Sequence, residues 1–276
     1  MQPFINIDLG GPAQPLLKVN HLLKYFRSGK GREVVQAVDD ISFTVMKGET
    51  LGVVGESGCG KSTTARLLMQ LLTQDSGELI FDGQGVGSSR LPLKAYRRQV
   101  QMVFQDSYAS LNPRLTMEES IAFGQRVHGV SAREASEYAR YLLAHVGLEP
   151  ARFADRYPHA LSGGQRQALT LLMATLQQPK LLLLDEHTAA LDPKTAAKVL
   201  EATQRIVEKN HLTTMMITHN MRDAISYGNR LIMMYEGHVV VDVSGEEKKN
   251  LTVEQLLNLF SRASGSDEAD DKLLLS

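Results

Sequence analysis

Apolar residues recur along this chain in two spacings: short continuous runs and longer stretches with helical periodicity. The short runs, bounded by glycine or polar residues, predict strands. They occupy residues 16–26, 34–45, 51–54, 78–81, 101–104, 181–184, 214–217 and 231–235. The helical spacing predicts helices over residues 62–72, 116–127, 132–146, 163–176, 194–209 and 221–227. The polar stretch 28–32 between the first two strands is typical of a hairpin turn.

The order of these elements predicts an α/β fold with a helical insertion. Strands and helices alternate after residue 178, which predicts a parallel sheet covered on both faces. From residue 106 to residue 178 only helices are predicted. The predicted divisions are a flexible leader at residues 1–15, a core at 16–105 and 179–262, a helical subdomain at 106–178 and a solvated acidic tail at 263–276.

Composition narrows the class of protein. The 276 residues include 30 Lys and Arg against 31 Asp and Glu, a balance that argues against a basic nucleic-acid-binding domain. The single cysteine, Cys59, excludes an internal disulfide. We see neither a signal peptide nor an apolar run near the ~18 residues that a membrane span needs. These observations predict a soluble intracellular protein.

A phosphate-binding loop follows the strand at residues 51–54. Residues 55–62 read Gly55-Glu56-Ser57-Gly58-Cys59-Gly60-Lys61-Ser62 and match G-x-x-x-x-G-K-[ST] at every fixed position. The glycines let successive N–H groups point at one anion, and the helix starting around Thr63 turns its positive end to the same phosphates. Lys61 places a charge on the β and γ oxygens, and Ser62 offers a hydroxyl to Mg²⁺. A chance glycine-rich turn is the alternative; the predicted strand and helix on either side favour a nucleoside triphosphate site.

Two adjacent carboxylates provide a second landmark. Asp185 and Glu186 end the apolar run 181–184, and the chain can turn both side chains toward the phosphates at a strand's end. Asp185 suits the shell of Mg²⁺, and Glu186 suits the polarisation of an attacking water. The alternative is an acidic turn with no catalytic role. The presence of a phosphate-binding loop in the same chain favours the catalytic interpretation.

The segment Leu161-Ser162-Gly163-Gly164-Gln165 lies between these two landmarks. On these motifs, residues 16 to 259 resemble the ATP-binding cassette (ABC) ATPases. The resemblance implies a P-loop NTPase fold of the ABC nucleotide-binding type, with an antiparallel β subdomain and a helical subdomain that carries this signature. It also implies that Ser162, Gly163, Gly164 and Gln165 grip the γ-phosphate held by a second copy, so that ATP lies between two subunits. A plain helix N-cap is the alternative use of this segment.

Further positions gain a role only through this resemblance. Tyr25 matches the aromatic residue that stacks on adenine, although a half-buried strand aromatic is the alternative. Gln105 matches the glutamine that touches Mg²⁺ and water and links to the transmembrane partner. Asp192 matches the loop that crosses the dimer interface, and His219 matches the histidine that contacts the γ-phosphate. Cys59 lies inside the phosphate loop and is expected to perform no chemistry.

The two halves of the chain resemble different branches of the family. Residues 103–114, Val-Phe-Gln-Asp-Ser-Tyr-Ala-Ser-Leu-Asn-Pro-Arg, resemble the dipeptide, oligopeptide and nickel importers. Ala168, Met173, His187 and Ala189 depart from that pattern, and residues 168–264 resemble a small branch of amino-acid-like importers. We interpret this as a possible chimera joined near residues 161–167, with a divergent natural member as the alternative. A chimera would pack loosely along the signature helix.

Together these features predict the ATP-binding and ATP-hydrolysing subunit of an ABC transporter that imports peptides or nickel. The expected ligands are ATP and Mg²⁺. The expected partners are a second ATP-binding subunit, identical or different, and separate transmembrane permease subunits, with no nucleic acid. The protein is expected on the cytoplasmic face of the cell membrane. The alternatives are a soluble ABC ATPase not coupled to transport and an ATP-binding engineered chimera without transport function.

Overall fold

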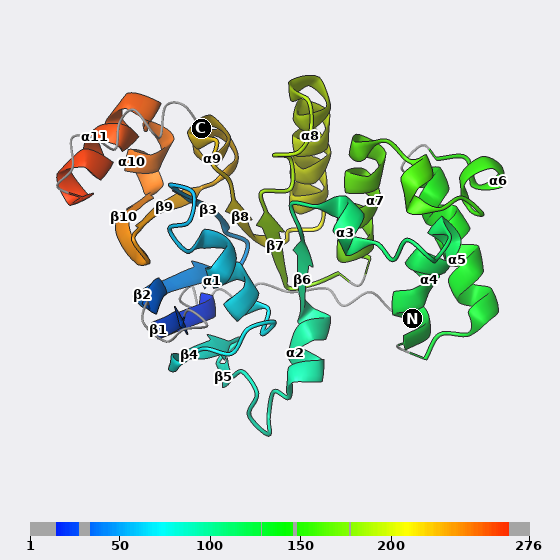
Figure 1. Ribbon diagram of the computed structural model, residues 1–276, viewed down its shortest axis with the longest axis horizontal. Helices are drawn as coiled ribbons and strands as arrows, with labels where there is room; N and C mark the ends of the chain where they lie inside the picture. Colours follow the sequence, from blue (N-terminus) through cyan, green and yellow to red (C-terminus); the bar gives the residue numbers. More distant parts are fainter. Residues whose placement is uncertain (1–14, 28–33, 128, 146–147, 177, 265–276) are drawn as a thin grey trace.

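The computed structural model describes residues 15–27, 34–127, 129–145, 148–176 and 178–264. These residues form two β-sheets and a separate group of helices, which Figure 1 shows side by side. The strands are β1 (Pro15–Arg27), β2 (Val34–Met46), β3 (Thr50–Gly55), β4 (Ser76–Phe81), β5 (Gln84–Gly85), β6 (Val100–Val103), β7 (Leu181–Asp185), β8 (Thr213–Ile217), β9 (Arg230–Tyr235) and β10 (His238–Ser244).

The larger sheet has six strands in the order β10-β9-β3-β8-β7-β6. All neighbouring pairs from β9 to β6 are parallel, and only β10 runs antiparallel to β9. Strands β7 and β8 are buried along their whole length, which explains their continuous apolar runs. The carboxyl ends of β3, β7 and β8 lie along one edge, because their registers pair Val53 and Asp185 with the same residue, Ile217. The predicted parallel sheet is therefore confirmed.

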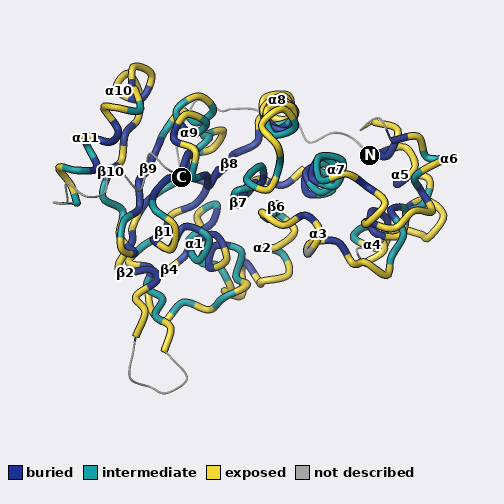
Figure 2. Tube along the Cα trace, turned by 45° about the horizontal axis from the view of Figure 1, so that its top comes forward, coloured by how far each residue is buried: buried dark blue, intermediate teal, exposed yellow. Residues whose placement is uncertain are grey.

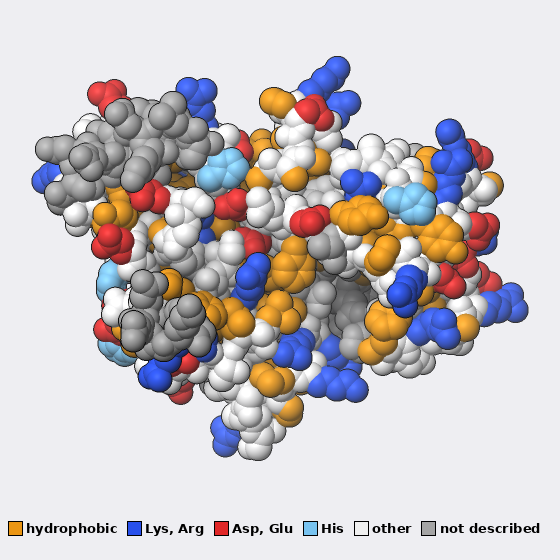
Figure 3. Space-filling view, viewed as in Figure 1, with side chains coloured by type: hydrophobic (Ala, Val, Ile, Leu, Met, Phe, Trp, Pro, Cys, Tyr) orange, Lys and Arg blue, Asp and Glu red, His pale blue; other side chains and the backbone are white. Residues whose placement is uncertain are grey.

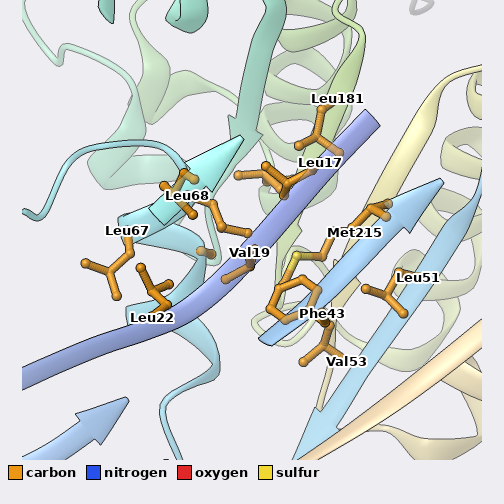
Figure 4. Packing of buried hydrophobic residues seen from close by; sticks show 14 of the residues in the cluster. Leu17, Val19, Leu22, Phe43, Leu51, Val53, Leu67, Leu68, Leu181 and Met215 are labelled. Atoms are coloured by element: carbon orange, nitrogen blue, oxygen red, sulfur yellow. The ribbon is translucent and has the colours of Figure 1, made fainter. Parts of the chain in front are cut away.

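The smaller sheet is antiparallel, in the order β2-β1-β4-β5. Its inner face packs on the parallel sheet: Leu17, Val19 and Phe43 lie among Leu51, Val53, Leu181 and Met215 (Figure 4). Leu67 and Leu68 of helix α1 (Lys61–Leu68) complete the same core. This core fixes the phosphate loop, because the loop joins β3 to α1 within it.

Helices cover the parallel sheet and form the separate group. They are α2 (Leu93–Gln99), α3 (Ser107–Ser110), α4 (Met117–Val127), α5 (Ala132–His145), α6 (Pro150–Phe153), the 3-10 turn η1 (Pro158–Ala160), α7 (Gly163–Thr175), α8 (Pro193–Lys209), α9 (Met221–Tyr227), α10 (Gly245–Lys249) and α11 (Val253–Ser264). Figure 2 shows their outer faces exposed around the buried strands of the larger sheet. Helices α3 to α7 lie between β6 and β7 in the chain, as the sequence predicts for the helical insertion.

Helix α7 belongs to two cores at once. Its Leu169 is buried in the cluster of the helical group, with Ile121 and Leu143. Its Leu171 is buried against strands β6 and β7, with Val103 and Leu182. The helix therefore joins the helical group to the parallel sheet.

Several elements differ from those predicted. Helix α1 ends at Leu68, whereas the sequence predicts a helix as far as residue 72. Residues 69–72 already belong to the connection that leads to β4. Elements α2, α3, β5, α6, β10, α10 and α11 were not predicted. The leader lies outside the described residues apart from Pro15, as do the turn at 28–32 and the tail apart from Ala263 and Ser264. Within the described ranges, every helix is too short or too polar to cross a bilayer.

Candidate functional site

The phosphate loop connects β3 to α1 and has a backbone that only glycine can supply. Gly60 has φ +103°, and a Cβ atom there would lie 2.1 Å from the carbonyl oxygen of Ala37. Gly60 is also the N-cap of α1 and provides no side-chain hydrogen bond to it. The first N–H groups of α1 are therefore left for another acceptor, as at other anion-binding helix starts.

The Lys61 side chain is folded into this loop. It is 4% exposed, and its Nζ donates hydrogen bonds of 2.8 Å to the carbonyl oxygens of Gly55 and Glu56. An ammonium has three hydrogens, and the third is directed at Sγ of Cys59, 3.9 Å from Nζ in the same loop. The charge is thus held at the centre of the loop, where it can meet an anion wrapped by residues 55–62.

Ser62 in the first turn of α1 and Asp185 at the end of β7 are joined by a hydrogen bond. The Ser62 hydroxyl donates to Oδ1 of Asp185 at 2.7 Å. Burial raises the pKa of Asp185, and this hydrogen bond opposes the rise. A hydroxyl and a carboxylate oxygen so close together are the hard ligands that Mg²⁺ prefers, so the residues present fit this ion.

Glu186 and His219 face each other at the ends of β7 and β8. Nδ1 of His219 lies 3.6 Å from Oε2 of Glu186, and their side chains are 38% and 18% exposed. Glu186 adopts a left-handed backbone with φ +46°, and its N–H donates to the carbonyl oxygen of Ile217 at 2.9 Å. A partly exposed carboxylate next to the phosphate loop can accept a proton from water.

His187 is a buried residue of this site that the sequence did not reveal as one. Its side chain is 2% exposed, and its Nε2 lies 3.1 Å from Oγ1 of Thr203 on α8. Burial lowers its pKa to about 4, so the ring is neutral at pH 7. No sequence motif connects positions 187 and 203, because their contact depends on how α8 packs against the loop.

Tyr25 is connected to the phosphate loop through the turn between β9 and β10. Its hydroxyl donates to Oδ1 of Asp39 at 2.6 Å. The N–H of Asp39 donates to the carbonyl oxygen of Gly237, and the N–H of Gly237 donates to that of Cys59. Cys59 is buried, and burial raises the pKa of its thiol, which agrees with a purely structural role. The structure therefore brings Tyr25 to the rim of the site, and Asp39 is a second residue that sequence reasoning missed.

The signature segment starts α7 and forms the helix N-cap predicted as its alternative use. The N–H of Gln165 donates to Oγ of Ser162, and the N–H of Ser162 donates to Oε1 of Gln165. Gly164 faces α8, since a Cβ atom there would lie 2.4 Å from Cγ2 of Thr195. Among the hydrogen bonds between described residues, none joins this segment to the phosphate loop of the same copy. Within one copy of the chain, the signature residues are therefore not hydrogen-bonded to the phosphate-binding residues.

Gln105 and Asp192 lie on segments that flank the site. Gln105 is exposed just after β6, and the amide Nε2 of Gln167 donates to the carbonyl oxygen of the preceding Phe104 at 3.3 Å. Asp192 caps α8 by accepting a hydrogen bond from the N–H of Thr195 at 3.1 Å. Hydrogen bonds from the Thr195 side chain and backbone lower the pKa of Asp192. A hydrogen bond therefore connects the residue before Gln105 to α7, and another connects the end of the loop that follows Glu186 to α8.

Similar proteins are consistent with this geometry. A family model described as ABC transporter matches residues 38–189. A tyrosine transport ATP-binding protein of Clostridioides difficile (strain R20291) is 37% identical over 255 residues, covering 90% of this chain and 100% of the relative. The oligopeptide transport ATP-binding protein OppF of Bacillus subtilis (strain 168) is 40% identical over 231 residues, covering 82% of this chain and 75% of the relative.

Solved structures agree in fold. A dimeric ATP-binding cassette in a post-hydrolysis state, bound to ADP and Pi, superposes with a TM-score of 0.72 at 28% identity. The match covers 83% of this chain and 98% of that one.

The comparisons do not support a chimera. The family match runs without interruption across residues 161–167, and helix α7 is buried in both cores it touches. The predicted fold class and the predicted ATPase class are confirmed. The chain belongs to the ABC transporter family, with the fold of its nucleotide-binding domain.

Proposed function

We propose that this chain hydrolyses ATP at the edge of its parallel sheet and thereby powers an importer of peptides. The observation that carries the proposal is the convergence of Lys61, Ser62, Asp185, Glu186 and His219 at the ends of three neighbouring strands. The loop at 55–63 binds the phosphates, with Lys61 on their β and γ oxygens. Tyr25 stacks on the base.

The remaining side chains act on the metal and on water. Ser62 and Asp185, assisted by Gln105, would hold Mg²⁺, and this ion would supply neutralisation of charge on the phosphates. Glu186 accepts the proton of the attacking water as general base, and His219 contacts the γ-phosphate. Because Glu186 is partly open to solvent and Asp185 is buried, the two carboxylates divide the roles of base and ligand.

A second copy or a related subunit completes the site. Ser162, Gly163, Gly164 and Gln165 present a capped helix start that does not reach the phosphate loop of its own chain. Head-to-tail pairing brings that helix start to the γ-phosphate of the partner. The dimeric arrangement of the structurally similar cassette supports this pairing.

The membrane partner docks beside the helical group. A groove of about 250 Å³ separates β6 from α4 and α7, and its lining includes Phe104, Ile121, Phe123 and Met173. Phe123 is 60% exposed there, and hydrophobic side chains gather over the helical group in Figure 3. An apolar groove next to Gln105 suits a segment of a permease, and docking there supports the proposal that the protein acts at the cytoplasmic face of the membrane.

The substrate class rests on resemblance. The segment after Gln105 resembles peptide and nickel importers, and the Bacillus relative is named for oligopeptide transport. A free amino acid is the second candidate, because the relative matched over its whole length is named for tyrosine transport. Nickel stays a prediction.

Two measurements test the proposal. Phosphate release by the purified chain with ATP and Mg²⁺ tests hydrolysis, and its absence would favour a binding module without turnover. Co-purification with hydrophobic subunits, followed by reconstitution in vesicles, then separates an importer from an uncoupled soluble ATPase. In those vesicles we expect short peptides to stimulate hydrolysis; stimulation by tyrosine or nickel alone would overturn the peptide assignment.

A further inference from the structure

The loop that follows Glu186 is anchored to helix α8 through one buried ring. This loop covers residues 186–192 and turns twice: the N–H of Ala189 donates to the carbonyl of Glu186, and that of Leu191 donates to the carbonyl of Thr188. Among these seven residues, all of them described by the structure, only His187 has a buried side chain. The ring points to α8, where it meets the Thr203 hydroxyl.

The hydrogen atoms in this contact can be assigned. The Thr203 hydroxyl donates its single proton to the carbonyl oxygen of Val199 at 2.8 Å, because a carbonyl oxygen can only accept. Oγ1 is then an acceptor toward His187, so Nε2 carries the hydrogen of this contact. The contact is therefore a directed N–H···O bond from the loop to the third turn of α8.

The backbone of Glu186 gives this bond its importance. Glu186 holds a left-handed conformation, which non-glycine residues adopt only when the surrounding structure enforces it. On one side, its N–H is bonded to Ile217 of β8. On the C-terminal side of Glu186, the next residue, His187, is held by its contact with Thr203.

We propose that His187 is a positioning residue that holds the Glu186 carboxylate against the water to be activated, by anchoring the loop to Thr203. The proposal rests on the role of Glu186 in the proposed function. Without the anchor, residue 186 can relax from its left-handed backbone, and its carboxylate moves away from the reacting water. Nucleotide binding is not expected to change, since residues 55–63 do not touch His187 through any hydrogen bond among the described residues.

A pair of amide variants separates the hydrogen bond from the ring. In His187→Gln the side-chain amide nitrogen can stand where Nε2 stands, whereas in His187→Asn it is one bond too short. We expect His187→Asn to lower kcat about 10- to 100-fold with an unchanged KM for ATP, as small misplacements of reacting groups do. His187→Gln should recover most of that loss.

The other end of the bond is tested with threonine variants. Thr203→Val keeps the shape and removes the acceptor, so it should lower kcat as His187→Asn does, while Thr203→Ser should not. Thr175→Val is the matched control, because Thr175 also donates to a carbonyl oxygen of its own helix but lies away from the loop. We expect the control to keep the parental kcat.

These variants distinguish a role of His187 in positioning Glu186 from a role in stabilising the fold. A selective loss of kcat in His187→Asn and Thr203→Val, restored in His187→Gln, supports the proposal. Parental kcat in His187→Asn overturns it, as does an equal loss in His187→Gln. A joint change of kcat, KM and melting temperature also overturns it, because that pattern reports a damaged fold. An inactive parent would instead contradict the proposed function itself.

Discussion

The Ser62 hydroxyl and the Asp185 carboxylate are 123 positions apart in sequence and share a 2.7 Å hydrogen bond. The bond connects the first turn of α1, which follows β3 in the chain, to the end of β7. Strands β3 and β7 are not neighbours in the sheet, because β8 lies between them. It places the two proposed metal ligands together before any ion is bound, so little rearrangement is needed to hold one.

Lys61→Ala removes the charge at the centre of the phosphate loop. We expect ATP affinity to fall at least about tenfold, because charge-assisted hydrogen bonds are among the strongest polar contacts. Calorimetry or fluorescence titration with a labelled ATP measures the loss. Lys94→Ala removes an exposed lysine of α2 and serves as the control. Equal affinity in Lys61→Ala and its parent would show that residues 55–62 do not bind the phosphates.

Glu186→Gln keeps the shape of the side chain and removes the proton acceptor. We expect hydrolysis to fall about 100-fold or more, within the range of general-base catalysis, while ATP still binds. ATP should then remain between two copies, so light scattering should detect a dimer that requires ATP. Hydrolysis at the parental rate would remove Glu186 from the mechanism.

Gly164→Ala tests the signature segment through its packing. The new methyl group would clash with Cγ2 of Thr195, so either the Thr195 side chain or the start of α7 must shift. We expect ATP binding by the single copy to persist and hydrolysis, which needs the partner's helix start, to fall several-fold. Gly85→Ala in β5 adds a methyl group that meets open space and is the control. Unchanged hydrolysis at several protein concentrations would argue against head-to-tail pairing.

Asp82→Asn tests an ionic contact between the two sheets. Hydrogen bonds from Lys180 and Lys47 lower the pKa of Asp82 below its ordinary value. The stabilisation is therefore present above that ordinary value and is lost as the pH falls through the lowered pKa. We expect the variant to lose about 1 kcal/mol of unfolding free energy at pH 7 and to match the parent in strong acid.

Denaturant unfolding at several pH values measures this difference. Asparagine tolerates the left-handed backbone at residue 82, so the change isolates the charge. Asp155→Asn removes an exposed charge from the helical group and is the control. A difference that stays constant with pH would show that the ion pairs do not stabilise the fold.

Local patterns predicted most strands and the long helices because their burial follows periodicity. The first four residues of strand β7 are all leucine and the strand was predicted, whereas α2 buries only Tyr96 and offers no repeating pattern. Helix α11 had a usable signal that was missed: Thr252 and Gln255 form a reciprocal cap in front of the buried residues Leu256 and Phe260. Strand β10 follows a two-residue turn ending in Gly237, a hairpin pattern that was also missed.

The residues of the candidate site that belong to sequence motifs could be predicted from the sequence. Lys61, Ser62 and Glu186 could be chosen from spacing, and the structure brings them to one edge of the sheet. The contact of His187 with Thr203 and that of Tyr25 with Asp39 could not be chosen, because they depend on helix packing and strand register. The left-handed backbone at Glu186 is likewise a product of its surroundings.

Two hydrogen bonds between backbone atoms join Asp39, Gly237 and Cys59 at one corner of the site. A hydrogen bond between backbone atoms survives any side-chain exchange that the local backbone tolerates, so point mutations rarely sever this corner. Inserting or deleting one residue in the turn after β9 would shift both bonds out of register at once. We therefore expect natural and engineered variation here to keep Gly237, where φ is +83° and a Cβ atom would lie 2.9 Å from the carbonyl oxygen of Gln36, and to keep the number of residues in the turn fixed.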